Sequence, residues 1–339
     1  MGVLVKFKSN ALVALVSCAA VALIGATAGC SSATDAPAAP AADGGSTGSF
    51  PRTVTHALGA AEIPAAPKRV VALDTSYSDA TLLLETELVG YVTYRSAGLP
   101  DYLGESRGEF APNAVAVGEL TTPSLEKIAE LQPDLIVSAK VRHGDIYDQL
   151  SKIAPTVMSE TTGPTWKDNI RLLGQALGKE DLAEQKIGAY ETRAAEVGAD
   201  INAKADNPTV TVVRFAGEPT ARLYRTTSFS GIVLADAGIN RPASAGPDPA
   251  KPASISNDIS PELITEAEAD LIVVSTYHSG DGKSEAAAQP FVTNPLWAGL
   301  RGQKVDVDDA LWMSAVSVQG AGGILDDLAT HFGVDGRRD

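Results

Sequence analysis

Two stretches of this chain, 136 residues apart, carry the same pattern. Residues 124–137 read SLEKIAELQPDLIV and residues 260–273 read SPELITEAEADLIV, with Ser, Glu, Ile, Glu, Asp, Leu, Ile and Val at matching places. In each copy a serine precedes a short helical segment with an acidic first turn, and a buried strand follows. Solenoid repeats are only about 20–50 residues long. The spacing therefore predicts two related lobes.

Short apolar runs alternate with helical patterns along most of the chain. The runs include 70–73, 135–137, 210–215 and 271–274. This alternation predicts an α/β fold with Rossmann-like lobes and parallel-rich sheets. A long helical region at 166–204, interrupted near Gly178, lies between the two repeat copies. We therefore expect an N-terminal lobe at 54–180, a linking helix at 181–206 and a C-terminal lobe at 207–335, with a ligand cleft between the lobes.

The N-terminal segment has the features of an export signal. Residues 1–29 contain Lys6 and Lys8, then a run of apolar and small residues that is too short for a committed membrane span. Thr27-Ala28-Gly29-Cys30 resembles a bacterial lipobox, although Thr27 replaces the usual large aliphatic residue. The resemblance implies that Cys30 is lipidated; the alternative is an ordinary cleaved signal. Residues 30–53, rich in Ala, Pro, Gly and Ser, predict a flexible tether.

Composition excludes several classes of function. The net charge of −15 argues against nucleic-acid binding, which depends on basic surfaces. Four dispersed histidines and two cysteines form no zinc or manganese ligand pattern. The chain has no Gly-x-Ser-x-Gly motif, and no carboxylate pair is singled out by spacing. We therefore expect a protein that is not an enzyme.

An ordered set of short segments runs through most of the chain: PKRVVAL at 67–73, PSLEKI at 123–128, LQPDLIV at 131–137, IAPT at 153–156 and NPLW at 294–297. This set resembles the substrate-binding lipoproteins of iron–siderophore ABC importers, the helix-linked class of periplasmic binding proteins. The resemblance implies capture of a ferric siderophore, without a cofactor, by a lipid-anchored monomer on the extracytoplasmic face of the cell membrane. It also implies delivery to a permease dimer with ATPase subunits, with Glu126 and Glu262 contacting permease arginines.

A ferric siderophore is already a complete chelate, so its receptor needs cationic donors and flat apolar surfaces more than metal ligands. In hydroxamate-binding members of the family an arginine at the position of Arg95 contacts the chelate. Across the family an aromatic residue at the position of Trp312 commonly faces the cleft. Other candidates lie at or after predicted strand ends. The predicted ligand-binding set is Tyr94, Arg95, Arg142, Trp166, Arg214, Tyr224, Arg225, Tyr277 and Trp312.

The sequence leaves several points open. Trp166 could belong to the core or face the cleft, and only one of Arg222 and Arg225 need point inward. His143 and His278 are interpreted as solvated loop residues. The alternative functions within the same fold are haem and cobalamin binding, where His143, Tyr277 or His278 could supply an axial ligand to haem. The number of candidate arginines leaves hydroxamate, catecholate and carboxylate siderophores all possible.

Overall fold

The structure is a computed structural model that describes residues 48–94, 98–278 and 280–337. The predicted signal, Cys30, most of the tether and Arg95 lie outside the described residues. A two-stranded hairpin, β1 (Arg52–His56) and β2 (Gly59–Ile63), comes first. Its first strand therefore begins within the range predicted as tether.

The first lobe is built on a six-stranded sheet in the order β6-β5-β4-β3-β7-β8, parallel except for β6. Its strands are β3 (Val70–Ala72), β4 (Leu88–Thr93), β5 (Val115–Glu119), β6 (Thr122–Pro123), β7 (Leu135–Ala139) and β8 (Thr156–Ser159). Its helices are α1 (Thr75–Leu83), η1 (Asp101–Leu103), α2 (Gly104–Phe110), α3 (Leu125–Glu130), α4 (Lys140–His143), η2 (Gly144–Ile146), α5 (Tyr147–Leu150) and α6 (Trp166–Leu177).

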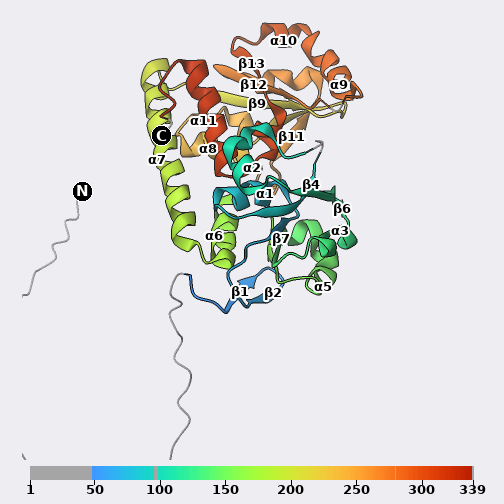
Figure 1. Ribbon diagram of the computed structural model, residues 1–339. Helices are drawn as coiled ribbons and strands as arrows, with labels where there is room; N and C mark the ends of the chain where they lie inside the picture. Colours follow the sequence, from blue (N-terminus) through green and yellow to red (C-terminus); the bar gives the residue numbers. More distant parts are fainter. Residues whose placement is uncertain (1–47, 95–97, 279, 338–339) are drawn as a thin grey trace, which may run out of the picture. The chain divides into compact units, whose positions relative to one another are not determined.

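The second lobe is built on a five-stranded sheet in the order β11-β10-β9-β12-β13, in which β9, β12 and β13 are parallel. Its strands are β9 (Val210–Phe215), β10 (Ala221–Tyr224), β11 (Ser256–Ile259), β12 (Leu271–Thr276) and β13 (Gln303–Val307). Its helices are α8 (Phe229–Asp236), η3 (Ala243–Ala245), η4 (Pro261–Ala267), α9 (Lys283–Val292), α10 (Pro295–Gly299), the π-helix η5 (Ala310–Ser314) and α11 (Val318–Phe332). The α/β fold with two parallel-rich sheets is confirmed (Figure 1).

The sequence repeat has a structural basis in the two sheets. The Asp134 carboxylate accepts hydrogen bonds from the backbone N–H groups of Lys68 and Arg69, which lead into β3. In the second lobe the Asp270 carboxylate accepts from the backbone N–H of Thr209, which leads into β9. The strand pairs then share a register, with Leu135 opposite Val70 and Leu271 opposite Val210. Each aspartate thus aligns its strand with the neighbouring central strand.

The helical half of the repeat differs between the lobes. Ser124 caps α3 by accepting a hydrogen bond from the Lys127 N–H, as predicted. Ser260 makes no such bond, and its segment forms the 3-10 helix η4 with Pro261 in the first turn. Proline has no N–H and a fixed φ, so the first turn of this copy has one donor fewer to cap.

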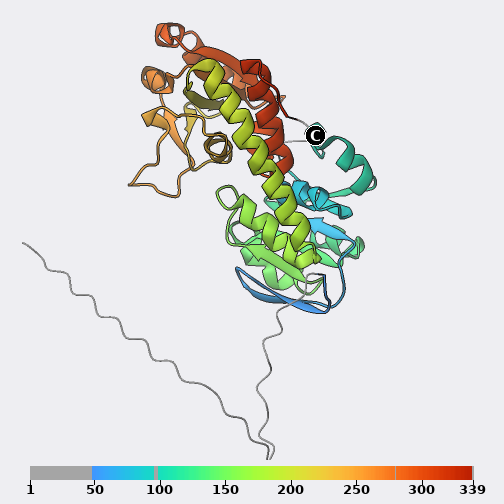
Figure 2. The ribbon, with the colours of Figure 1, turned by 90° about the vertical axis from the view of Figure 1, so that its left-hand side faces the viewer.

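A single long helix, α7 (Glu180–Ala205), joins the lobes. Gly178, in the left-handed conformation at φ 70°, ends α6 just before it, where the sequence predicted an interruption. At about 1.5 Å per residue, α7 is about 39 Å long. It packs against α6 in the first lobe and against α8 and α11 in the second (Figure 2). The predicted linking helix is confirmed.

One continuous hydrophobic core passes through both lobes and α7. Buried residues of this core include Val70 in β3, Ile187 in α7 and Val273 in β12. Trp166 lies at the junction, with ring centroids 5.3 Å from Tyr190 on α7 and 5.8 Å from Phe229 on α8. Because interiors are closely packed, this arrangement resists large hinge motions. Among the described helices, none combines the length and apolar character needed to span a bilayer.

Candidate ligand-binding site

The parallel strands of the first lobe bring polar side chains to one edge of the sheet. The residues just beyond five strand ends line a hollow of about 170 Å³: Asp74 and Thr75 after β3, Tyr94 after β4, Leu120 after β5, Arg142 after β7, and Thr162 and Gly163 after β8. The carboxyl edge of a parallel sheet is where α/β proteins place ligands. This edge is therefore the first half of a candidate site.

The second lobe completes the hollow from the opposite side. Arg214 at the end of β9, Arg222 and Tyr224 on β10, Ser230 on α8 and Trp312 on η5 all line it. A neighbouring hollow of about 330 Å³ is lined by Tyr277, His278 and Asp309, among others. The two hollows share Thr75, Tyr94 and Ser314. We call them together the interlobe cleft.

Each described arginine that lines the interlobe cleft is held by a carboxylate. Arg142 Nε donates to Asp74 Oδ2 at 3.0 Å, and Arg222 pairs with Glu218. Arg214 donates through Nε and Nη2 to the two oxygens of Asp309 at 2.6 and 2.7 Å, and through Nη1 to the Tyr224 hydroxyl at 3.2 Å. Burial alone would lower the pKa of Arg214, but the hydrogen bonds and charge of Asp309 raise it overall.

An irregular segment of the second lobe carries the aromatic wall of the cleft. Trp312 is buried within the π-helix η5, and its Nε1–H donates to Asp327 at 2.8 Å. Val316 follows with φ at 39°, a conformation that is strained for a β-branched residue. Both residues line the cleft. Strained backbone concentrates at functional sites, which agrees with the placement of this segment.

Six members of the predicted ligand-binding set line the interlobe cleft: Tyr94, Arg142, Arg214, Tyr224, Tyr277 and Trp312. The structure brings them together from both lobes. Their contact with a ligand stays a prediction. Arg95, the residue favoured by the family resemblance, lies outside the described residues.

Two members of the set lie elsewhere. Trp166 is 1% exposed within the continuous core, which decides the alternative that the sequence left open. Arg225 is also 1% exposed, and its guanidinium binds Asp248 at 3.1 Å, the Lys251 carbonyl at 3.3 Å, and Asn257. Since neither lines the cleft hollows, this geometry argues against a direct ligand contact for either. Arg222, two residues from Tyr224 on the same face of β10, is the inward-facing arginine.

The carboxylates that hold the arginines were not among the predicted site residues. Asp74 lies two residues beyond the end of β3 and also caps α1, accepting from the Ser76 N–H at 3.0 Å. Asp309 follows β13 and also accepts from the Ser275 hydroxyl at 2.7 Å. Both aspartates lie just beyond a strand of their sheet, as Arg142 does, so their position after a predicted strand was the signal that could have identified them.

The interpretation of His143 as a solvated loop residue is wrong. Its side chain is buried, with Nδ1 2.7 Å from the Ser138 hydroxyl and Nε2 2.7 Å from the Leu120 carbonyl. Burial lowers its pKa. Since both ring nitrogens are engaged, His143 has no free position for an axial ligand role. His278 is exposed and pairs with Glu285, as expected of a loop residue.

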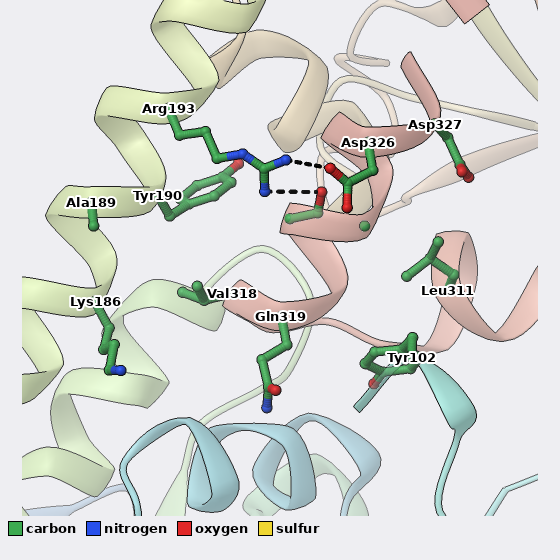
Figure 3. Close-up of a pocket in the computed structure, with 12 residues that line it drawn as sticks. Tyr102, Lys186, Ala189, Tyr190, Arg193, Leu311, Val318, Gln319, Asp326 and Asp327 are labelled. Atoms are coloured by element: carbon green, nitrogen blue, oxygen red, sulfur yellow. Dashed lines mark hydrogen bonds and ion pairs between the residues drawn. The ribbon is translucent and has the colours of Figure 1, made fainter. Parts of the chain in front are cut away.

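A separate hollow of about 590 Å³ lies between α7 and α11 (Figure 3). Arg193 points across it to Asp326 and also donates to the Gly336 carbonyl at 2.8 Å. Lys186 lies 3.3 Å from Glu85. Both cations are already paired, and the described residues that line this hollow include none from a strand end. We therefore assign no ligand to this hollow. Within the described ranges, no group of three or more His, Cys, Asp or Glu side chains is arranged to hold a metal ion.

Comparison with known proteins identifies the family. The model of the family described as periplasmic binding protein matches residues 70–304. The chain belongs to the periplasmic binding protein family. A probable siderophore-binding lipoprotein of Bacillus subtilis, YfiY, is 37% identical over 292 residues, covering 83% of this chain and 87% of its own. The Fe(3+) dicitrate-binding periplasmic protein FecB of Escherichia coli is 26% identical, covering 84% of this chain and 91% of its own.

Solved structures of periplasmic binding proteins agree with the fold. The crystal structure of Staphylococcus aureus SirA complexed with staphyloferrin B matches with a TM-score of 0.75 and 30% identity, covering 84% of this chain and 100% of that chain. FeuA from B. subtilis, complexed with ferri-bacillibactin, matches with a TM-score of 0.65 at 22% identity, a likeness of fold. The helix-linked, two-lobed fold is therefore shared with SirA and FeuA.

Proposed function

We propose that this protein is the extracytoplasmic solute-binding component of an ABC importer, and that it captures a ferric siderophore in the interlobe cleft. The main observation in support is that strand ends from both sheets meet at one cleft. The side chains there include arginines, hydroxyl groups and aromatic rings. Arg142 offers donors from the first lobe and Arg222 from the second. Trp312, itself buried, lies against the wall of the cleft beside these donors. The similarity to siderophore-binding relatives agrees with this composition.

Capture would involve a modest closure of the lobes. The Thr75 hydroxyl on the first lobe donates to the Ser314 carbonyl on the second at 2.9 Å, and both residues line the interlobe cleft. The continuous core behind the cleft limits the motion further. A ligand held by both lobes would add contacts in the closed form and shift the population toward it. The closed form would then be the one delivered to the permease.

The proposed role requires no catalytic step and no resident cofactor, because iron arrives as a complete chelate. Delivery would use the exposed Glu126 on α3 and Glu262 on η4, which occupy equivalent positions in the two lobes. A lipid on Cys30 would hold the mature protein, a monomer, at the membrane near its permease. These partners and this anchor belong to the proposal.

Titration of the mature protein with ferric siderophores tests the function. Binding should quench tryptophan fluorescence, because Trp312 lines the cleft. Arg142→Gln and Arg95→Ala should each weaken the best ligand about tenfold by removing a charge-assisted donor. An unchanged dissociation constant in both variants would remove these arginines from the site.

Haem and cobalamin serve as the competing ligands in the same experiment. Since His143 is excluded, Tyr277 and His278 are the remaining candidates for an axial haem ligand, and both line the second hollow. A haem absorption band that shifts on titration and is lost in Tyr277→Phe would replace the siderophore assignment. Absence of binding to any ferric chelate would refute it.

A further inference from the structure

The interlobe cleft is electrically balanced. Among its described lining residues the permanent cations are Arg142, Arg214 and Arg222, and each has its own carboxylate. Asp308 lines the second hollow as well. Over the part of the cleft that the structure describes, these charges leave no positive excess for a strongly anionic ligand.

The three arginines differ in what they can still offer. Arg214 is enclosed, with 4% of its side chain exposed, so its role is to orient Asp309 and Tyr224. Arg142 and Arg222 keep 40% and 29% of their side chains exposed. A ligand would thus meet one accessible guanidinium on each lobe, each already neutralised by a partner. Such a pair can donate hydrogen bonds without supplying net charge.

Neutral hydroxyl groups make up most of the remaining polar lining. They come from both lobes and from both hollows: Thr75, Tyr94, Thr162, Tyr224, Ser230, Tyr277 and Ser314. A hydroxyl both donates and accepts, and it is suited to oxygen atoms that carry partial charge. A multiply charged anion would lose its hydration on entering the cleft without meeting a matching positive field, which is costly.

We infer, resting on the proposed function, that the cleft selects ferric chelates of zero or nearly zero net charge, of the tris-hydroxamate class. Three singly charged hydroxamates balance Fe(III) and leave amide-like oxygens around the metal. Three doubly charged catecholates leave three negative charges on the complex. The balanced arginine–carboxylate pairs and the hydroxyl lining suit the first kind of chelate and disfavour the second.

Fluorescence titration with two hexadentate ferric chelates, a neutral tris-hydroxamate and a tris-catecholate, tests the inference. The neutral chelate should bind at least about tenfold more tightly. Its dissociation constant should change less than about twofold between low and high salt, because screening acts on net charge. Tighter binding of the tris-catecholate would overturn the inference and leave the proposed function standing. Failure of both chelates and of ferric citrate to bind would instead count against the function.

A single substitution can give the cleft a net positive charge. Glu218→Gln releases Arg222 from its partner and adds one net positive charge beside the ligand. Affinity for the tris-catecholate should rise about tenfold at low salt. Affinity for the neutral chelate should stay within about twofold.

The matched control is Glu184→Gln, which removes a glutamate paired with Arg171 at 2.8 Å on the α6–α7 surface. This control should leave both affinities unchanged. Equal effects of Glu218→Gln and Glu184→Gln on the tris-catecholate would show that total charge, and not the cleft, sets the preference. No effect of Glu218→Gln in a protein with unchanged circular dichroism would likewise overturn the inference.

Discussion

Asp79 and Gly320 meet across the join between the two lobes. The Asp79 carboxylate on α1 accepts a hydrogen bond from the Gly320 N–H, in the first turn of α11, at 3.3 Å. Gln319 Nε2 donates to the same carboxylate at 3.2 Å. Asp79 is fully buried, and this burial raises its pKa to about 7 in spite of the hydrogen bonds that it accepts. A titratable group therefore lies inside the contact that joins α1 to α11.

The first prediction concerns the pH dependence of stability. Between the ordinary pKa of 3.8 and the folded value of about 7, the folded state binds a proton at Asp79 that the unfolded state has lost. The contribution of Asp79 to the free energy of unfolding therefore falls as pH rises through this range. Asp79→Asn cannot titrate. The stability difference, wild type minus variant, should fall by on the order of 2 kcal/mol from pH 5 to pH 7.

Urea unfolding of both proteins at several pH values measures this difference. Other titrating groups, such as the buried His143, are common to both proteins and cancel. A difference that stays constant from pH 5 to pH 8 would show that Asp79 keeps an ordinary pKa in the folded protein.

Sequence patterns predicted the architecture because periodicity and repeats report on local structure. The Asp-Leu-Ile-Val ends of the two repeat copies do lie at equivalent strands, and Asp134 and Asp270 align those strands in the same way. The spacing of Ile187, Tyr190, Ala194 and Val197 marks the buried face of α7. The helix face needs only residues that are close in the chain, and the equivalence of the strands needs only a comparison of two short segments.

The errors at the site concern contacts between residues distant in the chain. Arg225 points away from the cleft, unlike Arg222, because Asp248 and Asn257 on other segments bind its guanidinium. No local sequence pattern predicts these partners. His143 is buried against Leu120, 23 residues earlier in the chain, whose carbonyl oxygen lies 2.7 Å from its Nε2. The choice between core and cleft for Trp166 depended on Tyr190 and Phe229, which lie on the linking helix and in the other lobe.

The second prediction concerns the buried ion pair beneath the cleft. Asp309→Asn leaves the Arg214 guanidinium, with 4% of its side chain exposed, without its charged partner. The free energy of unfolding should fall by about 3 kcal/mol, since breaking one side of a buried pair strands the other charge. Asp101→Asn breaks the exposed pair with Arg107 and should cost less than about 1 kcal/mol. Equal losses in the two variants, measured by urea unfolding, would contradict the assignment of a buried pair.

The third prediction concerns docking on the permease. Glu126→Lys combined with Glu262→Lys should abolish uptake of the ferric siderophore by cells and leave its dissociation constant unchanged. The chain offers a matched control in Glu130 and Glu266, which are also equivalent in the repeat, exposed and on the same two segments. Glu130→Lys with Glu266→Lys changes the net charge equally and should leave uptake close to that of wild type. Unimpaired uptake in the first double variant would show that Glu126 and Glu262 are not needed for docking on the permease.

The last prediction compares two glycines of the linking helix, ten residues apart. A Cβ at Gly198 would lie 1.6 Å from the Ala237 carbonyl oxygen at the end of α8, whereas a Cβ at Gly188 would meet nothing within 4 Å. Gly198→Ala must therefore push α7 and α8 apart, and it should lower the free energy of unfolding by about 3 kcal/mol. Gly188→Ala should raise it by up to about 1 kcal/mol, because alanine favours the helix more than glycine. Urea unfolding measures the change in the free energy of unfolding for each variant. Changes of opposite sign would show that α7 packs tightly against the second lobe at Gly198. No change in Gly198→Ala would show that this contact is loose.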